Sequence, residues 1–151
     1  DSAPMTLAKP LGKGLFVSGQ LTLTTLQAAP DMGVRTIVNN RPDGESTDQT
    51  PGADIEAAAR ALGVGYQAIA VDHSGFNHAQ IEQLWSLIDQ ADGAIWAYCR
   101  SGMRSTALWA LAMARYGTLD IVEIVSLAAG AGYEISGLEP QLRALRDEQP
   151  A

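Results

Sequence analysis

The sequence has little cysteine, little histidine and few basic residues, and each shortage excludes a class of protein. A single cysteine among 151 residues leaves no partner for an internal disulfide and excludes a zinc or iron–sulfur site built from several cysteines. Two histidines add few ligands, and we expect neither a metal nor another cofactor. With 10 Lys and Arg against 17 Asp and Glu, the net charge of −7 argues against nucleic-acid binding, which depends on clustered basic side chains.

Long hydrophobic runs are also missing. No apolar stretch approaches the roughly 18 residues that a membrane-spanning helix needs, so we expect no membrane span. The first residues, Asp1-Ser2-Ala3-Pro4, contain neither the basic segment nor the apolar stretch of a signal peptide, which favours the cytoplasm. Because the chain begins with Asp rather than Met, we expect that it has been trimmed, and a periplasmic location stays open.

The remaining composition is that of one globular domain. Hydrophobic residues make up 46% and charged residues 18% of the chain, as in folded proteins. A chain of this length buries roughly 70% of its unfolded surface without a disulfide or metal. We expect residues 1–10 to form an N-terminal extension and residues 11–147 to form a single domain. No pattern in the sequence indicates an oligomeric state.

One pattern occurs three times: a helical stretch, a glycine and a short strand. The predicted helices are residues 24–32, 54–62 and 77–92, and the strands that follow them are residues 34–38, 66–71 and 94–98. Glycine directly after a helix provides the left-handed cap that ends it. Asn77 and Gln80 have the spacing of a capping box at the start of the third helix. Pro30 is expected to kink or shorten the first helix.

Strands that alternate with helices of this length pair in parallel through right-handed crossovers. A further strand is predicted at residues 15–18, and the chain after residue 104 has the pattern of helices alone. The sequence therefore predicts an α/β fold: a single domain with a four- to five-stranded, mainly parallel sheet flanked by helices. Ligands in such sheets bind at the carboxyl ends of the strands.

The only cysteine lies where a strand meets a helix. The strand at residues 94–98 ends directly before Cys99, and the next helix is expected to begin about five residues later. Loop amides can converge on an anion, the helix N-terminus adds partial positive charge, and Arg100 and Arg104 add two full charges. All three favour the thiolate, which is the nucleophilic form of cysteine. Gly102 permits a positive φ or a close backbone approach. We therefore predict that Cys99 is a nucleophile.

The cysteine loop, residues 99–104, reads C-R-S-G-M-R and resembles the active-site loop of rhodanese-type sulfurtransferases, C-R-x-G-x-[RT]. Followed by Ser105, it is also similar to the signature of tyrosine and dual-specificity phosphatases, C-x5-R-[ST], but is one residue shorter. Together with residues 17–20 and 39–45, it resembles the bacterial phosphatase-like domain also found fused to β-lactamase-like hydrolases, the DUF442 family. The resemblance covers about residues 11–140 and implies a fold like that of dual-specificity phosphatases.

The length of the cysteine loop distinguishes the two reactions. Between Cys99 and Arg104 lie four residues, namely Arg100, Ser101, Gly102 and Met103. A phosphatase loop has five residues there, which surround the phosphoryl oxygens. A tighter loop suits a smaller group, such as the outer sulfur of a persulfide. We therefore expect sulfur transfer, in which Cys99 takes a sulfane sulfur from a small anionic donor and passes it to an acceptor thiol. The loop residues would bind the donor.

Two features favour phosphate hydrolysis as the alternative. Ser105 follows the arginine, as in the phosphatases, where this residue assists release of the phosphocysteine. Asp72 precedes Cys99 by 27 residues, near the place of the general acid in dual-specificity phosphatases, and would protonate the leaving oxygen of a phosphoester. The simpler interpretation of Asp72 is a residue that caps a turn. His73 is either an exposed loop residue or a second proton donor.

A third class is a non-catalytic anion-binding module, although such a module has no need of a cysteine. The polar stretch at residues 39–51 should lie beside the cysteine loop, because both follow carboxyl ends of strands. Arg41 is either another substrate-binding cation or part of a turn. Asp43 and Glu45 are expected to shape that turn, with orientation of the arginines as their alternative role.

Overall fold

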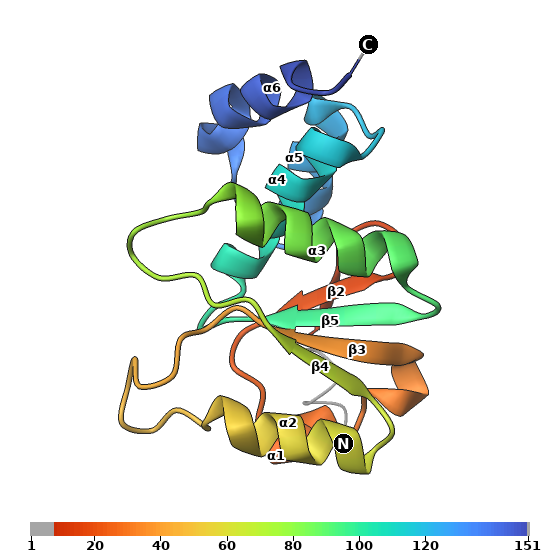
Figure 1. The fold of residues 1–151 in the computed structure, drawn as a ribbon, viewed down its shortest axis with the longest axis vertical. Coiled ribbons are helices and arrows are strands. Elements are labelled where there is room, and N and C mark those ends of the chain that lie inside the picture. The colour runs from red at the N-terminus through yellow and green to blue at the C-terminus, as the bar shows by residue number, and fades with distance from the viewer. Residues whose placement is uncertain (1–7, 151) are drawn as a thin grey trace.

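Five strands form one sheet in the order β1-β2-β5-β3-β4 in the computed structural model, which describes residues 8–150 (Figure 1). The strands are β1 (Lys9–Pro10), β2 (Leu15–Ser18), β3 (Val34–Asn39), β4 (Gly65–Ala68) and β5 (Ala94–Tyr98). β5 pairs in parallel with β2 and β3, β3 pairs in parallel with β4, and β1 is antiparallel to β2. The predicted α/β fold with a mainly parallel sheet is confirmed.

The edge strand β1 is not predicted by the sequence. Lys9–Pro10 pairs with Phe16 and Val17, so the sheet begins two residues before the predicted start of the domain at residue 11. A proline is tolerated here because an edge strand needs only half of its backbone groups for pairing. The predicted extension otherwise falls on residues 1–7, which lie outside the described residues.

Helices cover both faces of the sheet. They are α1 (Leu23–Leu26), α2 (Gly52–Ala61), α3 (His78–Gln90), α4 (Met103–Tyr116), α5 (Ile121–Gly130) and α6 (Glu139–Asp147). α1 and α2 lie on one face, and α3 to α6 lie on the other (Figure 1). The sheet is therefore the middle layer of three. Among residues 8–150, no helix has the length and hydrophobicity needed to cross a membrane.

Two of the predicted elements differ from the structure. The single helix predicted over residues 24–32 is wrong: α1 ends at Leu26, and a separate 3-10 turn occupies Pro30–Met32. Proline cannot donate the backbone hydrogen bond that a continuous helix needs, so the helix is interrupted. The strand predicted over residues 66–71 is also shorter, because β4 ends at Ala68.

The start of α3 agrees with the prediction. The Asn77 side chain accepts from the Gln80 backbone N–H at 2.9 Å, and the Gln80 side chain accepts from the Asn77 N–H at 2.8 Å. This reciprocal pair is the capping box predicted from the sequence. It fixes where the segment after β4 turns into the helix.

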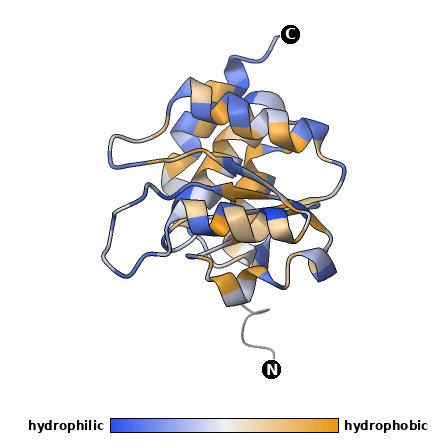
Figure 2. Cartoon of the chain, turned by 60° about the horizontal axis from the view of Figure 1, so that its bottom comes forward, coloured by the Kyte–Doolittle hydropathy of each residue, from blue (hydrophilic) through white to orange (hydrophobic). Residues whose placement is uncertain are grey.

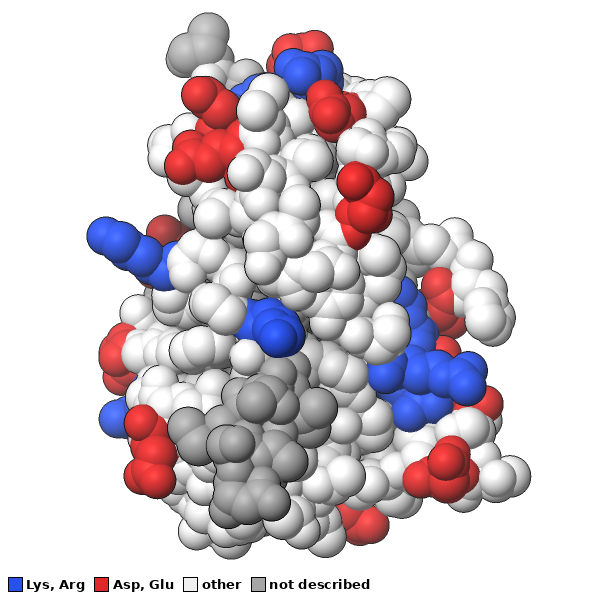
Figure 3. All heavy atoms as spheres, turned by 180° about the vertical axis from the view of Figure 1, so that it is seen from behind, with Lys and Arg blue, Asp and Glu red and all other residues white. Residues whose placement is uncertain are grey.

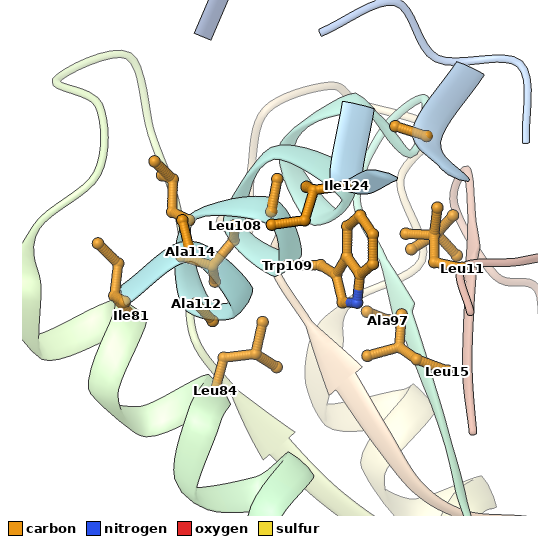
Figure 4. Packing of buried hydrophobic residues seen from close by; sticks show 14 of the residues in the cluster. Leu11, Leu15, Ile81, Leu84, Ala97, Leu108, Trp109, Ala112, Ala114 and Ile124 are labelled. Carbon is orange, nitrogen blue, oxygen red and sulfur yellow. The ribbon is translucent and has the colours of Figure 1, made fainter. Parts of the chain in front are cut away.

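The core lies on both faces of the sheet, and hydrophobic residues concentrate on the strands and helices rather than on the loops (Figure 2). Nine of the 14 residues of α4 are buried, and its Trp109 packs beside Leu11 and Ile124 (Figure 4). On the opposite face, Trp96 packs with Ile55. Each such side chain contributes about 1.5–3 kcal/mol by its burial, so α4 and the loop that precedes it are firmly held.

The sheet register brings three loops to one edge. Ser18 of β2 and Asn39 of β3 both lie opposite Tyr98, the last residue of β5. The residues that follow these strands, including Cys99, therefore meet at the carboxyl end of the sheet. Beyond β4 the chain still follows β3, because the Ile69 and Val71 N–H groups donate to the Asn39 and Asn40 carbonyls at 2.9 and 3.0 Å.

Candidate active site

Cys99 lies at the centre of this edge, directly after β5. Its Sγ accepts a hydrogen bond from the Gly102 N–H at 3.1 Å, so the sulfur faces the amides of its own loop. The residue is completely buried. The sulfur is therefore held by its own loop and is covered in this conformation.

Gly102 has a positive φ, one of the two possibilities expected for it. Its φ is +98°, a conformation that favours glycine, and it is the N-cap of α4. A Cβ at this position would collide with the hydroxyl oxygen of Tyr133. That hydroxyl donates to the Ser101 carbonyl at 2.9 Å. Tyr133, which sequence reasoning missed, therefore holds the cysteine loop from the side of the helices.

The loop after β2 holds the cysteine loop from the other side. The Gln20 N–H donates to the Arg100 carbonyl at 3.3 Å, and the Cys99 N–H donates to the Ser18 carbonyl at 3.4 Å. A Cβ at Gly19 would lie 2.9 Å from the same Arg100 carbonyl oxygen. Glycine at position 19 is therefore required for this close approach. The sequence motif includes this glycine, but the sequence alone does not show why it is needed.

Arg104 is fixed by a carboxylate from the loop after β3. Its Nη1 donates to Glu45 Oε2 at 2.7 Å and its Nη2 to Glu45 Oε1 at 2.8 Å, a two-point ion pair. Nη1 also donates to the Val71 carbonyl at 2.7 Å. The hydrogen bonds and charge of Arg104, together with those of Arg41, outweigh desolvation and lower the pKa of Glu45 to about 2. Glu45 raises the pKa of Arg104 in turn.

Arg41 lies behind Glu45 rather than in the open site. Its guanidinium is buried, with Nε donating to Glu45 Oε1 at 3.0 Å, Nη1 to Gln20 Oε1 at 3.0 Å and Nη2 to Ser46 Oγ at 3.1 Å. All three nitrogens are thus engaged by the protein. These contacts suit a residue that positions Glu45, and through it Arg104, better than the substrate-binding cation expected from the sequence.

An open pocket of about 620 Å³ lies over the cysteine loop, and we call it the anion pocket. Its lining residues are Pro42, Asp43, Gly44, Glu45, Asp72, His73, Arg100 and Arg104. Seen from behind, basic side chains gather at the edge formed by the carboxyl ends of the strands, with acidic side chains next to them (Figure 3). The structure therefore brings Arg100, Arg104 and Asp72 together at one pocket, and Cys99 is not itself part of the pocket lining.

Asp72 lies in a turn at the wall of the anion pocket. The residue is exposed and lines the anion pocket. Its Oδ1 accepts from the Ser74 Oγ at 2.6 Å and from the Ser74 N–H at 2.8 Å, as in a residue that caps a turn. These hydrogen bonds lower the pKa of Asp72. In this conformation the turn therefore stabilises the ionised form of the carboxylate.

Ser105 is buried in the first turn of α4. Its Oγ donates to Asn40 Oδ1 at 2.8 Å, while Asn40 Nδ2 donates to the Ile69 carbonyl at 2.8 Å. Asn40 therefore ties the first turn of α4 to the segment that leads to Asp72. Sequence reasoning did not single out Asn40, because a buried asparagine after a strand has the same local pattern as one in a turn.

The remaining loop residues have different surroundings. Ser101 is exposed, and its Oγ accepts from the Met103 N–H at 3.3 Å. Met103 is exposed and lines a neighbouring apolar pocket instead of the anion pocket.

In the part of the chain that the structure describes, no group of three or more His, Cys, Asp or Glu side chains is arranged to hold a metal ion.

Comparison with known proteins assigns the family. Residues 8–116 match the model described as "Beta-lactamase hydrolase-like protein, phosphatase-like domain". The chain belongs to this family. A beta-lactamase hydrolase-like protein of Xylella fastidiosa strain Temecula1 is 32% identical over 126 residues, which are 83% of this chain and 29% of that protein. The chain thus spans less than a third of the length of this curated relative.

Solved structures agree with this assignment. A candidate phosphatase of Neisseria meningitidis Z2491, nma1982, is 31% identical to this phosphatase-like domain, with a TM-score of 0.82 over 94% of this chain and 99% of that chain. Human DUSP28 has a TM-score of 0.68 at 17% identity, covering 93% of each chain, which shows a shared fold. The resemblance to a phosphatase-like family with this fold is confirmed.

Proposed function

We propose that this domain hydrolyses phosphate monoesters through a phosphocysteine formed on Cys99. The observation that carries the proposal is the position of Arg104, which Glu45 holds in the anion pocket above the cysteine loop. The loop length by itself favoured sulfur transfer, whereas the family and the phosphatase folds of its neighbours support phosphate hydrolysis.

The guanidinium of Arg104 retains a free edge for a phosphoryl group. An arginine has five N–H groups in a rigid fork. Within residues 8–150, three of them donate to Glu45 and Val71. The Nε–H and one Nη2–H remain, and they lie on the same edge, so they can donate together to two phosphoryl oxygens. Arg100, exposed at the same pocket, would add a second positive charge.

The proposed reaction has two steps. The Cys99 thiolate attacks phosphorus, and the bond between phosphorus and the leaving oxygen breaks. Asp72, once protonated, gives its proton to that oxygen. A water molecule then attacks the phosphocysteine, releasing inorganic phosphate and the thiolate. For Asp72 to act as an acid, its hydrogen bonds to Ser74 must break when substrate enters the anion pocket.

Ser105 and Arg41 act as positioning residues in this proposal. Ser105 holds Asn40, and Asn40 holds the segment that carries Asp72. Arg41 holds Glu45 from behind. Neither needs to touch the phosphoryl group, and their removal should misplace Arg104 or Asp72 rather than abolish the nucleophile.

Sulfur transfer is the second candidate, and the compact cysteine loop favours it. The loop has four intervening residues and directs the Gly102 N–H at Sγ, while the sulfur itself is covered. In this reaction Cys99 attacks the outer sulfur of a persulfide, the S–S bond breaks, and the donor leaves as a thiolate. The resulting Cys99 persulfide passes its outer sulfur to an acceptor thiol.

A paired assay distinguishes the two reactions. The wild-type protein and Cys99→Ser are each assayed with an aryl phosphate and with glutathione persulfide. We expect hydrolysis of the aryl phosphate that is absent in Cys99→Ser. Sulfur transfer that depends on Cys99, without phosphate release above that of Cys99→Ser, would overturn the proposal in favour of the second candidate.

A further inference from the structure

Arg104 lines two pockets of different character. One is the anion pocket, and the other is an apolar pocket of about 330 Å³. The apolar pocket is lined by Phe76, Met103, Ala107, Ile135 and Leu138, with Glu134 at its rim. A molecule with its charged end beside Arg104 would therefore meet a hydrophobic surface next to it.

Met103, which lines the apolar pocket, is unusually exposed for a large hydrophobic side chain. Met103 is 40% exposed and is one of three large hydrophobic side chains with such exposure within residues 8–150. The other two, Leu23 and Val122, lie in the first turns of α1 and α5 and line neither of the pockets that contain Arg104. Methionine adapts its shape to varied apolar ligands, and here it directly precedes Arg104.

The hydrophobic surface continues beyond this pocket. Phe76 and Leu138 also line a further cavity of about 390 Å³ between α3, α4 and α6, together with Ile81 and Leu111. The two cavities share Phe76 and Leu138, and we call the apolar surface that lines them the apolar groove. Its extent suits a group larger than a single short side chain.

The charges around the groove limit what it can accept. Glu134 lines the cavity next to Arg104, and Glu148, which pairs with Arg115 at 3.5 Å, lines the other cavity. Both are exposed carboxylates on a protein of net charge −7. A second acidic group on a substrate would be repelled there, whereas an uncharged hydrocarbon would lose contact with water and gain contact with Phe76 and Leu138.

We propose that this groove binds the organic part of the substrate, and that the substrate is a phosphate monoester of an uncharged, apolar alcohol. The inference rests on the proposed function, because it places the phosphate in the anion pocket. Each methylene buried in the groove should strengthen binding about fourfold. Short polar phosphoesters should then be poor substrates compared with aryl or alkyl ones.

Non-hydrolysable phosphonates test the groove without catalysis. Calorimetry on the Cys99→Ser protein compares methylphosphonate, hexylphosphonate and 6-carboxyhexylphosphonate. We expect hexylphosphonate to bind at least tenfold more tightly than methylphosphonate, and the terminal carboxylate to remove most of that gain. Leu138→Gln or Phe76→Ser should abolish the gain and leave methylphosphonate binding within twofold. Val122→Gln, which alters an exposed apolar residue elsewhere, is the matched control and should change neither.

Several results would overturn the groove. They are equal affinity for the two phosphonates, no measurable hexylphosphonate binding, tighter binding of the carboxylated ligand, or an equal loss in Val122→Gln. Sedimentation of the same proteins gives one more result that would overturn the proposal. If the protein is a dimer that Leu138→Gln converts to a monomer, and hexylphosphonate is not preferred, the groove binds a second copy of the chain instead. If the hexyl gain holds but no phosphoester is hydrolysed, the groove stands and the proposed hydrolysis fails. If phosphoesters are hydrolysed without a preference for apolar ones, the proposed hydrolysis stands and the groove fails.

Discussion

Glu45 and Arg104, 59 residues apart in the sequence, form a two-point ion pair with contacts of 2.7 and 2.8 Å. Arg41 donates to the same carboxylate from behind at 3.0 Å. The pair joins the loop after β3 to the first turn of α4 at the wall of the anion pocket. The arrangement makes Glu45 the residue on which the geometry of the site depends.

Glu45→Gln should therefore reduce both activity and stability. The amide keeps the shape but leaves two arginines without their counter-charge, so we expect kcat/KM for an aryl phosphate to fall about 10- to 100-fold. The free energy of unfolding should fall by about 2 kcal/mol, which is typical for the loss of a hydrogen bond to a charged group. Glu56→Gln removes an exposed pair with Arg60 and is the matched control. A Glu45→Gln protein as active as Glu56→Gln would contradict this role.

The same ion pair should make stability depend on pH in the acid range. Because the pKa of Glu45 is about 2 in the folded protein and about 4.5 when unfolded, its stabilising contribution is complete above the higher value. It is lost as the pH falls from about 4.5 towards 2. Urea unfolding of wild type and Glu45→Gln should show a gap in stability at pH 6 that closes towards pH 2. A gap that is constant over this range would exclude the ion pair as its cause.

Gly102→Ala should disrupt the cysteine loop. The alanine would have to adopt φ +98° and its Cβ would collide with the Tyr133 hydroxyl, so we expect a loss of about 1–3 kcal/mol in stability and of most activity. Gly130→Ala is the control, because the space around Gly130 is open, its φ is not positive and it lies outside both pockets. Thermal unfolding and turnover of the two variants provide the comparison, and equal behaviour would show that the loop tolerates a side chain.

If Asp72 is the general acid, the effect of replacing it should depend on the leaving group of the substrate. We expect Asp72→Asn to lower kcat by about 10²- to 10⁴-fold for an alkyl phosphate, and less for an aryl phosphate whose leaving oxygen needs no proton. Ser74→Ala removes the hydroxyl hydrogen bond that lowers the pKa of Asp72. The protonated form of Asp72 then persists to higher pH, so the alkaline limb of the pH–rate profile should move to higher pH. Equal losses for both substrates in Asp72→Asn would leave Asp72 as a turn residue.

Much of the fold could be predicted because it depends on local patterns. The strands at residues 15–18 and 94–98 and the capping box of Asn77 and Gln80 are read from short stretches of sequence, and the structure agrees with them. The edge strand β1 was missed because two residues carry no periodicity. The broken first helix shows a proline overriding the helical pattern around it.

The site was predictable only in part. The position of Cys99 between a strand and a helix identified the loop, and Gly102 was expected to have the conformation that it adopts. The partnership of Glu45 with Arg104 could be named only as an alternative, since residues 39–51 have no periodic pattern and the contact spans 59 residues. Tyr133 and Asn40 act through single hydrogen bonds between distant elements, for which the sequence holds no local signal.

The most direct test of phosphocysteine chemistry is mass spectrometry of the protein quenched in acid during turnover of an aryl phosphate. The account predicts a phosphoryl group on the peptide that contains Cys99, formed at the rate of the initial burst and absent in Cys99→Ser. Asp72→Asn should alter the rate of its formation but not its location. Turnover of the aryl phosphate with no phosphoryl adduct on Cys99 at any quench time, or with equal turnover in Cys99→Ser, would contradict the central claim.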